Sequence, residues 1–345
     1  MYSLQIAGFV NYSNDLDYLA DWGYEVFQTL SDYEVIKLLG NYDDAVRDFK
    51  ALLLRNSKEL VSNNFIFRDT IGLATADLFM KFRLLRRVEN GKSPIQKLRD
   101  KKWFARVVHK CVRLLGDEHN ITFNTLIHIA EIVGFKQSLK NFLPSVAKGI
   151  YDFYCGVDNA RVLDMSAGFG GRLVGAISSK HNYSYTGVDP ATETFMNLRK
   201  LAKFLNVENR VRLINKPFED CDNDLEDESF DIMFTSPPYF AKEKYSDEDT
   251  QSWKRYPTFN DWVDGFLKRS FKIVYKKLKR NSYMIINIAN VKIGGKEYDL
   301  ENATVQCALD AGFEYLQRKE MMMSSAPGTG RRYKTEPVFV FKKIT

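Results

Sequence analysis

Apolar residues recur at two different spacings along this chain. Up to about residue 140 they return every three or four positions, which is typical of amphipathic helices, and the breaks at LLGNYDD, VENGKSP and LLGDEHN contain turn-forming residues. After Pro144, short β-branched or aromatic runs alternate with helical patterns. The pattern therefore predicts a helical region, residues 1–140, and an α/β region, residues 141–345.

The second region predicts a mostly parallel sheet. The expected strands are RVLDMS, YSYTGVD, RVRLIN, FDIMFTS and SYMIINIA, separated by helical patterns that include Thr192 to Leu205 and DWVDGFLKRSFKIVYKKLK. Such alternation forms βαβ units with helices on both faces of the sheet. The last two runs, FEYLQRKEMM and PVFVFKK, have only a loop between them, which predicts an antiparallel hairpin. We therefore expect a seven-stranded sheet that is closed by this hairpin.

Composition adds few constraints. Hydrophobic residues make up 45% and charged residues 27% of the 345 positions, as in ordinary globular proteins. No apolar run approaches the roughly 20 residues that span a bilayer, and the N-terminus lacks a signal-peptide pattern, so we expect a cytoplasmic protein without membrane contact. The four cysteines and four histidines show no ligand-like spacing, so we expect neither disulfides nor a metal site.

Positive charge is concentrated in residues 81–113. This block holds twelve Lys or Arg and two acids, a local net charge of +10, within an overall net charge of +6. Apolar residues interleave with the charges, which predicts helices with a cationic polar face. Such a block is the electrostatic footprint of a nucleic-acid binder, and the alternative is a solvated helical face. The candidate contacts here are Arg86, Arg87, Lys101, Lys102 and Arg106.

A glycine-rich turn, in RVLDMSAGFGGRLVGA, follows the first expected strand and precedes a helix. A dinucleotide fingerprint fails because Leu173 occupies its third glycine position, and a phosphate-binding loop fails because no Lys-Ser or Lys-Thr pair follows Gly171. What remains is acid-x-Ser-x-Gly-x-Gly, from Asp164 to Gly170. With Asp189 at the end of the second strand, where a carboxylate can bind ribose hydroxyls, the pattern favours an adenosine-containing ligand held without phosphate recognition.

The stretch FTSPPYF, residues 234–240, ends a strand-like run on two prolines and an aromatic ring. Each proline fixes φ near −65° and lacks an N–H donor. The segment is therefore stiff, and its carbonyls are free to bind a group outside the sheet.

Together these motifs resemble the S-adenosylmethionine-dependent methyltransferases that act on exocyclic amino groups of DNA bases, over about residues 140–345. The glycine-rich stretch is similar to their first cofactor motif, NKPFED to their adenine contact, SPPY to their catalytic motif, and FLPSVAKGIYDFY to the element over the methionine part. The resemblance implies a Rossmann-like fold, S-adenosylmethionine as cofactor and DNA as substrate. The implied cofactor-binding residues are Asp164, Ser166, Ala167, Gly168, Phe169, Gly170, Asp189, Pro190, Phe218 and Glu219, and the implied catalytic residues are Ser236, Pro237, Pro238 and Tyr239.

The implied reaction is direct, in-line methyl transfer to a base flipped out of the duplex. The Ser236 hydroxyl and the Pro237 carbonyl would accept hydrogen bonds from the amino group, and Tyr239 would stack on the base. Serine at the start of the motif favours N4 of cytosine over N6 of adenine. A C5 enzyme needs a cysteine nucleophile, usually after a proline, and none of the four cysteines follows one.

Two segments of the α/β region are further candidates for DNA contact. The long polar loop after SPPY bears Trp253, Lys254 and Arg255, and GTGRRYKTEP between the last two strands offers Arg331 and Arg332 as phosphate contacts. An ordinary basic hairpin turn is the alternative for the latter.

No separate recognition domain is expected after the last strand, so recognition falls to the helical region, the SPPY loop or a restriction or recognition partner protein. In the helical region, LIHIAEIVGFKQSLKNFL partly matches a helix-turn-helix through Ala130 and Gly134, with ordinary helix packing as the alternative. Methylation of RNA or of a protein amide, and DNA binding on an inactive methyltransferase fold, remain alternatives. A bacterial restriction partner, a solitary regulator and a phage-encoded protection protein all fit.

Overall fold

The computed structural model describes residues 16–39, 41–88, 92–115, 139–323 and 334–344. Contacts divide the chain into two units. Residues 1–41 and 81–140 form the first, which we call the helical unit, and residues 42–80 and 141–345 form the second, the sheet unit.

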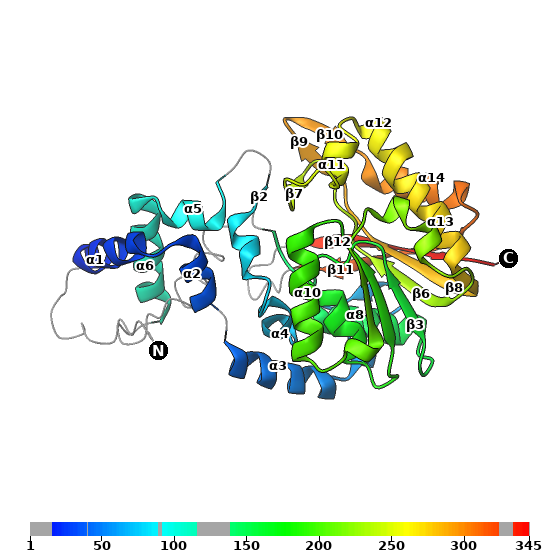
Figure 1. Cartoon of the computed structure of the whole chain (residues 1–345), viewed down its shortest axis with the longest axis horizontal. Helices are drawn as coiled ribbons and strands as arrows, with labels where there is room; N and C mark the ends of the chain where they lie inside the picture. Colours follow the sequence, from blue (N-terminus) through cyan, green and yellow to red (C-terminus); the bar gives the residue numbers. More distant parts are fainter. Residues whose placement is uncertain (1–15, 40, 89–91, 116–138, 324–333, 345) are drawn as a thin grey trace. The chain divides into compact units, whose positions relative to one another are not determined.

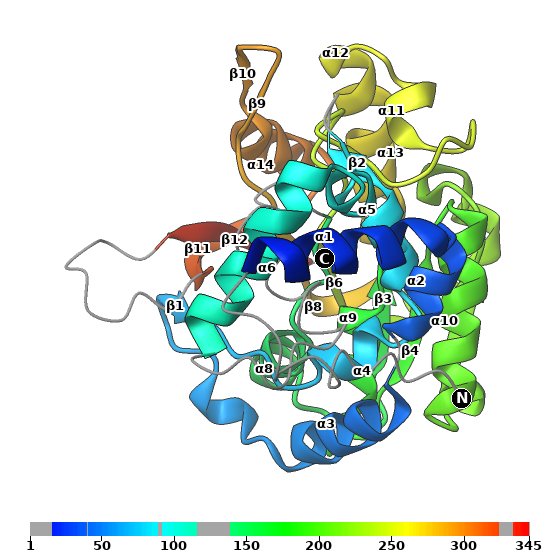
Figure 2. The same ribbon diagram turned by 90° about the vertical axis from the view of Figure 1, so that its left-hand side faces the viewer.

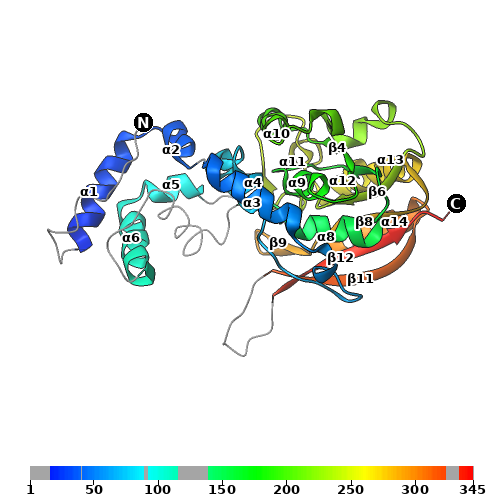
Figure 3. The ribbon, with the colours of Figure 1, turned by 90° about the horizontal axis from the view of Figure 1, so that it is seen from below.

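One eight-stranded sheet organises the sheet unit, in the order β1-β11-β12-β8-β6-β3-β4-β5 (Figure 1). Neighbours from β8 to β5 are parallel, whereas β12 runs antiparallel to both β8 and β11. The expected Rossmann-like α/β fold with a terminal antiparallel hairpin is therefore confirmed, and Figure 3 shows β11 and β12 as two long strands side by side. The sheet has eight strands rather than the expected seven, because β1 pairs in parallel with β11 beyond the hairpin. The strands are β1 (Phe65–Ile66), β3 (Arg161–Asp164), β4 (Ser184–Val188), β5 (Val211–Ile214), β6 (Phe230–Thr235), β8 (Leu278–Asn287), β11 (Glu314–Met322) and β12 (Thr335–Lys342).

Helices cover both faces of this sheet. On one face Leu163 of β3 shares a core with Trp262 and Phe271, and on the other Tyr151 contacts Phe234 of β6 with ring centroids 5.7 Å apart. Strands buried on both faces read as nearly continuous apolar runs, which is why FDIMFTS stands out in the sequence. The remaining elements from residue 144 onward are α8 (Pro144–Tyr154), α9 (Gly171–Ile177), α10 (Thr192–Phe204), η4 (Glu208–Arg210), η5 (Phe218–Asp220), η6 (Asp222–Asp224), β7 (Glu243–Lys244), α11 (Ser252–Arg255), α12 (Phe259–Trp262), the π-helix η7 (Val263–Lys268), α13 (Arg269–Lys277), β9 (Val291–Ile293), β10 (Lys296–Tyr298) and α14 (Leu300–Asp310).

Residues 42–80 group with the sheet rather than with the helical unit, which differs from the boundary expected after residue 140. Two buried lysines show the physical reason: the Nζ atom of Lys148 donates to the Leu52 carbonyl at 2.7 Å, and that of Lys319 donates to the Ser62 carbonyl at 2.5 Å. Figure 2 shows β1 beside β11, with which it pairs in parallel. This segment contains α3 (Tyr42–Leu54), η1 (Ser57–Glu59), β1 and α4 (Leu73–Asp77).

The helical unit has its own small core. Phe27 and Phe104 pack with ring centroids 5.6 Å apart, and the Arg99 guanidinium donates to the carbonyls of Phe27 and Leu30 at 3.1 and 2.7 Å. Part of the basic block is thus used inside the unit. Its elements are α1 (Leu16–Thr29), α2 (Asp32–Leu38), η2 (Lys81–Leu85), β2 (Arg87–Val88), α5 (Pro94–Leu98) and α6 (Lys101–Leu115). Within the described part of the chain, no helix has both the length and the apolarity to cross a bilayer.

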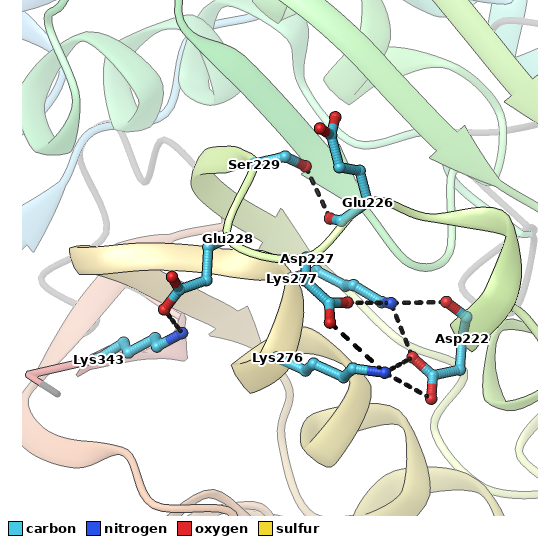
Figure 4. Close-up of polar contacts among 8 residues, drawn as sticks. All are labelled: Asp222, Glu226, Asp227, Glu228, Ser229, Lys276, Lys277 and Lys343. Atoms are coloured by element: carbon cyan, nitrogen blue, oxygen red, sulfur yellow. Dashed lines mark hydrogen bonds and ion pairs between the residues drawn. The ribbon is translucent and has the colours of Figure 1, made fainter.

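A buried lysine fixes the segment that leads into β6 (Figure 4). The Lys277 side chain is almost fully buried, and its Nζ atom lies 2.6 Å from the Asp222 carbonyl and 2.6 Å from the Asp227 carboxylate. Lys343, near the end of β12, pairs with Glu228 at 3.2 Å. These bonds attach the segment before β6 to the end of α13 and to the residue after β12.

Candidate active site

The glycine-rich turn between β3 and α9 requires glycines for conformational reasons. Gly168 and Gly170 have φ of +55° and +83°, in the left-handed region that glycine tolerates best. At Gly171 a Cβ atom would lie 1.9 Å from the Phe142 carbonyl oxygen, so a side chain has no room there. The turn therefore brings bare backbone to the carboxyl end of β3.

Asp164 is fully buried at the start of this turn and accepts hydrogen bonds from four residues, which lie in the turn, α9, β4 and β6. Its Oδ2 atom accepts from Arg172 Nε and from the Tyr185 hydroxyl, both at 2.7 Å. Its Oδ1 atom accepts from the Ser166 backbone N–H at 3.1 Å and from Thr235 Oγ1 at 2.8 Å. Asp164 thus ties the glycine-rich turn to the end of β6. The sequence motif did not reveal its partners Arg172, Tyr185 and Thr235.

Asp189, at the end of β4, faces the same turn. Its Oδ2 atom accepts from the Gly168 N–H and its Oδ1 atom from the Ala191 N–H, each at 2.9 Å. Burial raises the pKa of Asp189 to about 7, and the two backbone hydrogen bonds oppose this shift. Because a carboxylate oxygen has more than one acceptor position, each oxygen can still accept from a hydroxyl group.

Asn141, just before α8, holds the turn from its other side. Its Nδ2 atom donates to the Phe169 carbonyl at 2.7 Å and to Asp77 Oδ1 at 3.1 Å, and its Oδ1 atom accepts from the Gly171 N–H at 2.9 Å. Asn141 immediately precedes the stretch FLPSVAKGIYDFY, and Asp77 comes from the segment 42–80. Neither residue was expected from the sequence, since no local pattern distinguishes them.

The turn after β5 contains the two residues expected at the adenine. Phe218 and Glu219 are both buried, with 1% and 3% of their surface exposed. Burial raises the pKa of Glu219, whose Oε1 atom accepts from Arg255 Nη1 at 2.7 Å and from the Tyr256 hydroxyl at 3.0 Å. Arg255 also pairs with Asp220 at 2.9 Å. This arginine, expected at DNA, is therefore engaged with two carboxylates of the protein.

The SPPY segment leaves the carboxyl end of β6, one strand away from the glycine-rich turn. Directly after it Phe240 has φ of +53°, which is costly for a residue with a side chain. Its buried ring compensates, since it packs on Tyr298 and Phe259 with centroids 5.2 and 5.7 Å away. The Phe240 N–H donates to the Pro238 carbonyl at 2.9 Å, so the chain reverses tightly around Tyr239.

Two carboxylates that the motifs did not indicate lie beside Tyr239. The Tyr239 hydroxyl donates to Glu336 Oε2 at 3.5 Å. Glu243 accepts a hydrogen bond from the Tyr245 hydroxyl. Burial raises the pKa of Glu243, and the charge of Glu336 adds to this shift. The catalytic motif thus opens onto a cluster of two tyrosines and two glutamates.

The polar loop after SPPY is folded against the start of α10. Thr192 Oγ1 donates to Glu248 Oε2 at 2.8 Å, and Thr250 Oγ1 donates to the Pro190 carbonyl at 3.0 Å. Trp253, near the end of the loop, donates its indole N–H back to a carbonyl of the same loop at 3.3 Å. Pro190 is thereby bonded to the loop, and Trp253 is held within the loop itself.

Other expected DNA contacts are distributed over both units. On α6 of the helical unit, Lys102 and Arg106 are exposed, whereas Lys101 pairs with Asp21 at 2.9 Å. In the sheet unit Lys254 pairs with Asp249 at 3.1 Å. The exposed cations of α6 are therefore the clearest surface charges among these candidates.

Arg86 is half-buried within the helical unit. The other expected contacts lie outside the described structure. The side chain of Arg87 lies outside the described part, as do Arg331, Arg332 and the helix-turn-helix candidate with Ala130 and Gly134.

Strand order and motif placement together define the Rossmann-like fold of S-adenosylmethionine-dependent methyltransferases. Residues 230–344 match the N6/N4 methyltransferase family model described as DNA methylase, and residues 140–261 match the family described as conserved hypothetical protein 95. The resemblance expected from SPPY is confirmed by the first of these matches, which does not include the glycine-rich turn.

One curated relative is the Type II methyltransferase M.MjaVI of Methanocaldococcus jannaschii, 32% identical over 115 residues. The match covers 33% of this chain and 55% of the relative, so the chain spans about half the length of the curated relative it matches. The relative is archaeal and gives no support to the expected bacterial or phage origin.

Solved structures with a similar fold include two methyltransferases. Geranyl diphosphate C-methyltransferase from Streptomyces coelicolor is 12% identical with a TM-score of 0.44, covering 67% of this chain and 87% of that one. Precorrin-6y C5,15-methyltransferase from Geobacter metallireducens is 14% identical with a TM-score of 0.40, covering 61% and 92%. The fold assignment itself follows from the strand order.

Proposed function

We propose that the protein transfers a methyl group from S-adenosylmethionine to an exocyclic amino group of a DNA base, with N4 of cytosine as the first candidate and N6 of adenine as the second. One observation carries the proposal. Asp164 Oδ1 accepts hydrogen bonds from both Ser166 N–H and Thr235 Oγ1, so one buried carboxylate joins the glycine-rich turn to the residue before Ser236. Cofactor and acceptor motifs thus share one edge of the sheet, where ligands of such sheets bind.

The chain's residues suit the cofactor. S-adenosylmethionine supplies an electrophilic methyl group when it is bound. Asp189 would accept from the ribose hydroxyls, because each of its oxygens is held by only one backbone N–H. Gly168 and Gly170 leave backbone open to the ligand, and Asp164 acts as a positioning residue. Phe218 and Glu219 would flank the adenine.

The catalytic motif suits an amino group. An aryl amine is a poor nucleophile because its lone pair is delocalised into the ring. The Ser236 hydroxyl and the Pro237 carbonyl would accept its two hydrogens and favour a lone pair localised on nitrogen, an electrostatic form of catalysis. Pro238 keeps the segment rigid, and the Tyr239 ring would stack on the base. Positioning supplies the rest of the rate, without a covalent intermediate.

DNA as the substrate agrees with the match of residues 230–344 to the DNA methylase family. A base in a duplex must leave the stack to reach Tyr239, at a cost of a few kcal/mol. The helical region would contribute phosphate contacts through exposed cations such as Lys102 and Arg106. A role in restriction and modification is supported by the description of the curated relative as a Type II methyltransferase.

The substrate class is tested by incubating the protein with methyl-labelled S-adenosylmethionine and duplex DNA, single-stranded DNA, RNA or a protein extract. Label in DNA that is lost in Ser236→Ala is the expected result. Ser282→Ala is a matched control, because Ser282 lies in β8 at the opposite end of the sheet from the motif. Label only in RNA or protein would replace the proposal with one of the alternatives.

A further inference from the structure

The cations of the basic block, residues 81–113, divide into two groups in the folded chain. Several that precede α6 are bound within the helical unit: Arg83 Nη1 donates to the Leu139 carbonyl at 3.0 Å, and Arg99 Nη2 pairs with Asp32 at 2.7 Å. The fold itself uses these cations. Only the second group, on α6, is available to a partner.

Three cations of α6 form a single row at the surface, which we call the α6 row. Lys102, Arg106 and Arg113 are exposed, and none of their side chains has an ion pair or hydrogen bond to a residue that the structure describes. They occupy positions i, i+4 and i+11, which lie within about 40° of one another around a helix of 3.6 residues per turn. The opposite face of α6 packs into the core of the helical unit through Phe104 and Val108.

Two members of the α6 row are unfavourable for the helix that carries them. Lys102 lies in the first turn, where the helix dipole repels a positive charge, and Arg106 is a like charge four residues further on. None of the 15 residues of α6 is acidic, so no carboxylate on this helix balances the pair. Arg113, in the last turn, is the one member that the dipole favours. Because the first two charges oppose helix stability, a negatively charged partner explains their placement better than the fold does.

We propose that the α6 row binds phosphates of both strands of duplex DNA without reading the base sequence. The row spans about 16 Å along the helix axis, at 1.5 Å per residue, whereas the major groove is roughly 12 Å wide. Cations at its two ends can therefore reach phosphates on either side of the groove. No hydrogen bond within the described structure fixes the direction of these three side chains, as bidentate contact with a base would require, so phosphate contacts suit them better.

This inference rests on the proposed function, because it takes DNA as the substrate. It adds that sequence-independent affinity arises on α6, whereas the SPPY motif would act on the base. Such affinity depends strongly on salt, since each phosphate contact releases counterions from the DNA.

The test is the salt dependence of binding to duplex DNA, measured by fluorescence anisotropy with the full chain and without cofactor. Each phosphate contact contributes about 0.9 to the slope of log K against log salt concentration. Lys102→Gln combined with Arg106→Gln should lower this slope by about 1.8 and weaken binding about 30-fold at ~0.15 M salt. Adding Arg113→Gln should lower the slope by about 0.9 more. The losses should be equal on duplexes of unrelated sequence, because phosphates carry no sequence information.

A matched control removes the same charges elsewhere on the chain. Lys180→Gln combined with Arg280→Gln also replaces one lysine and one arginine that are exposed and have no ion pair to a described residue. Both lie at the amino ends of strands, Lys180 before β4 and Arg280 near the start of β8. This control should keep the wild-type slope.

Urea unfolding separates a structural role of the row from a binding role. The Lys102 and Arg106 double variant should unfold at the same urea concentration as wild type or at a higher one, because it removes two charges that oppose the helix. A lower midpoint, an unchanged salt slope, or a loss confined to some sequences would overturn the proposal. A slope reduced with RNA but not with DNA would assign the row to another polyanion and overturn it too. Absence of methyl transfer by wild type, with the slopes as expected, would contradict the proposed function alone.

Discussion

Substitution of Asp189 by asparagine probes the cofactor site most directly. The carboxylate accepts the N–H groups of Gly168 and Ala191 at 2.9 Å each, and both oxygens retain capacity for ribose hydroxyls. In Asp189→Asn an NH₂ group, which donates hydrogen bonds, replaces one carboxylate oxygen. The other oxygen still accepts hydrogen bonds, but it no longer carries negative charge to strengthen them. A hydrogen bond to a charged group is worth about 1 kcal/mol more than a neutral one, so two hydroxyl contacts lose about 2 kcal/mol together.

A loss of about 2 kcal/mol corresponds to a roughly 30-fold weaker affinity for S-adenosylmethionine. The stability of the unliganded protein should change less, because the cost of one unpaired N–H is offset by removal of a buried charge. Titration calorimetry with the cofactor measures the affinity, and urea unfolding measures the stability.

Asp231→Asn is the matched control for this variant. Asp231 also accepts a backbone N–H, that of Arg161 at 2.8 Å, and pairs with Lys279 at 2.6 Å, but it lies at the start of β6. Its substitution should leave cofactor affinity unchanged. A change of less than threefold in Asp189→Asn, or an equal loss in both variants, would refute the assignment of Asp189 to the ribose.

Three further outcomes follow from the site. Cofactor affinity should rise as the pH increases through about 7, because burial raises the pKa of Asp189 to about 7 and only the ionised form accepts from two hydroxyls. The same raised pKa should make the unliganded protein less stable as the pH rises from 3.8 to about 7, because the folded form holds the proton more tightly than the unfolded form. An affinity in calorimetry, or a free energy of unfolding in urea, that does not change with pH would contradict the raised pKa. Arg172→Met leaves Asp164 buried without its cation and should lower the free energy of unfolding by about 3–5 kcal/mol, whereas a loss under 1 kcal/mol would show that the pair is dispensable. Gly171→Ala forces a Cβ against the Phe142 carbonyl and should cost about 1–3 kcal/mol in urea unfolding, and an unchanged midpoint would mean that the turn adapts.

Much of the sheet unit could be predicted because its signals are local. The strand-like runs and the turns between them lie in short stretches, and β12 ran antiparallel as expected since no helix joins it to β11. The cofactor and catalytic motifs each follow directly after a parallel strand, so the sequence also predicted both at the edge formed by the carboxyl ends of the strands. Residues 42–80 were assigned to the wrong neighbours because helical periodicity shows which face is apolar but not what covers it.

The contacts that shape the site are long-range and have no local signature. Glu336 meets Tyr239 across 97 positions, and Thr235 meets Asp164 across 71. Arg255 was expected at DNA from its charge alone, but its partner Glu219, 36 positions earlier, appears only when the chain is folded. A charge pattern indicates which groups are available, whereas the tertiary structure decides which of them remain exposed.

The central claim is that the SPPY motif delivers a methyl group to an exocyclic amine of DNA. The most direct measurement is nucleoside mass spectrometry of duplex DNA of mixed sequence after incubation with the protein and methyl-labelled S-adenosylmethionine. The account predicts labelled N4-methyldeoxycytidine, or N6-methyldeoxyadenosine as the second candidate, and no label with Ser236→Ala. Label in 5-methyldeoxycytidine, or undiminished label with Ser236→Ala, would contradict it.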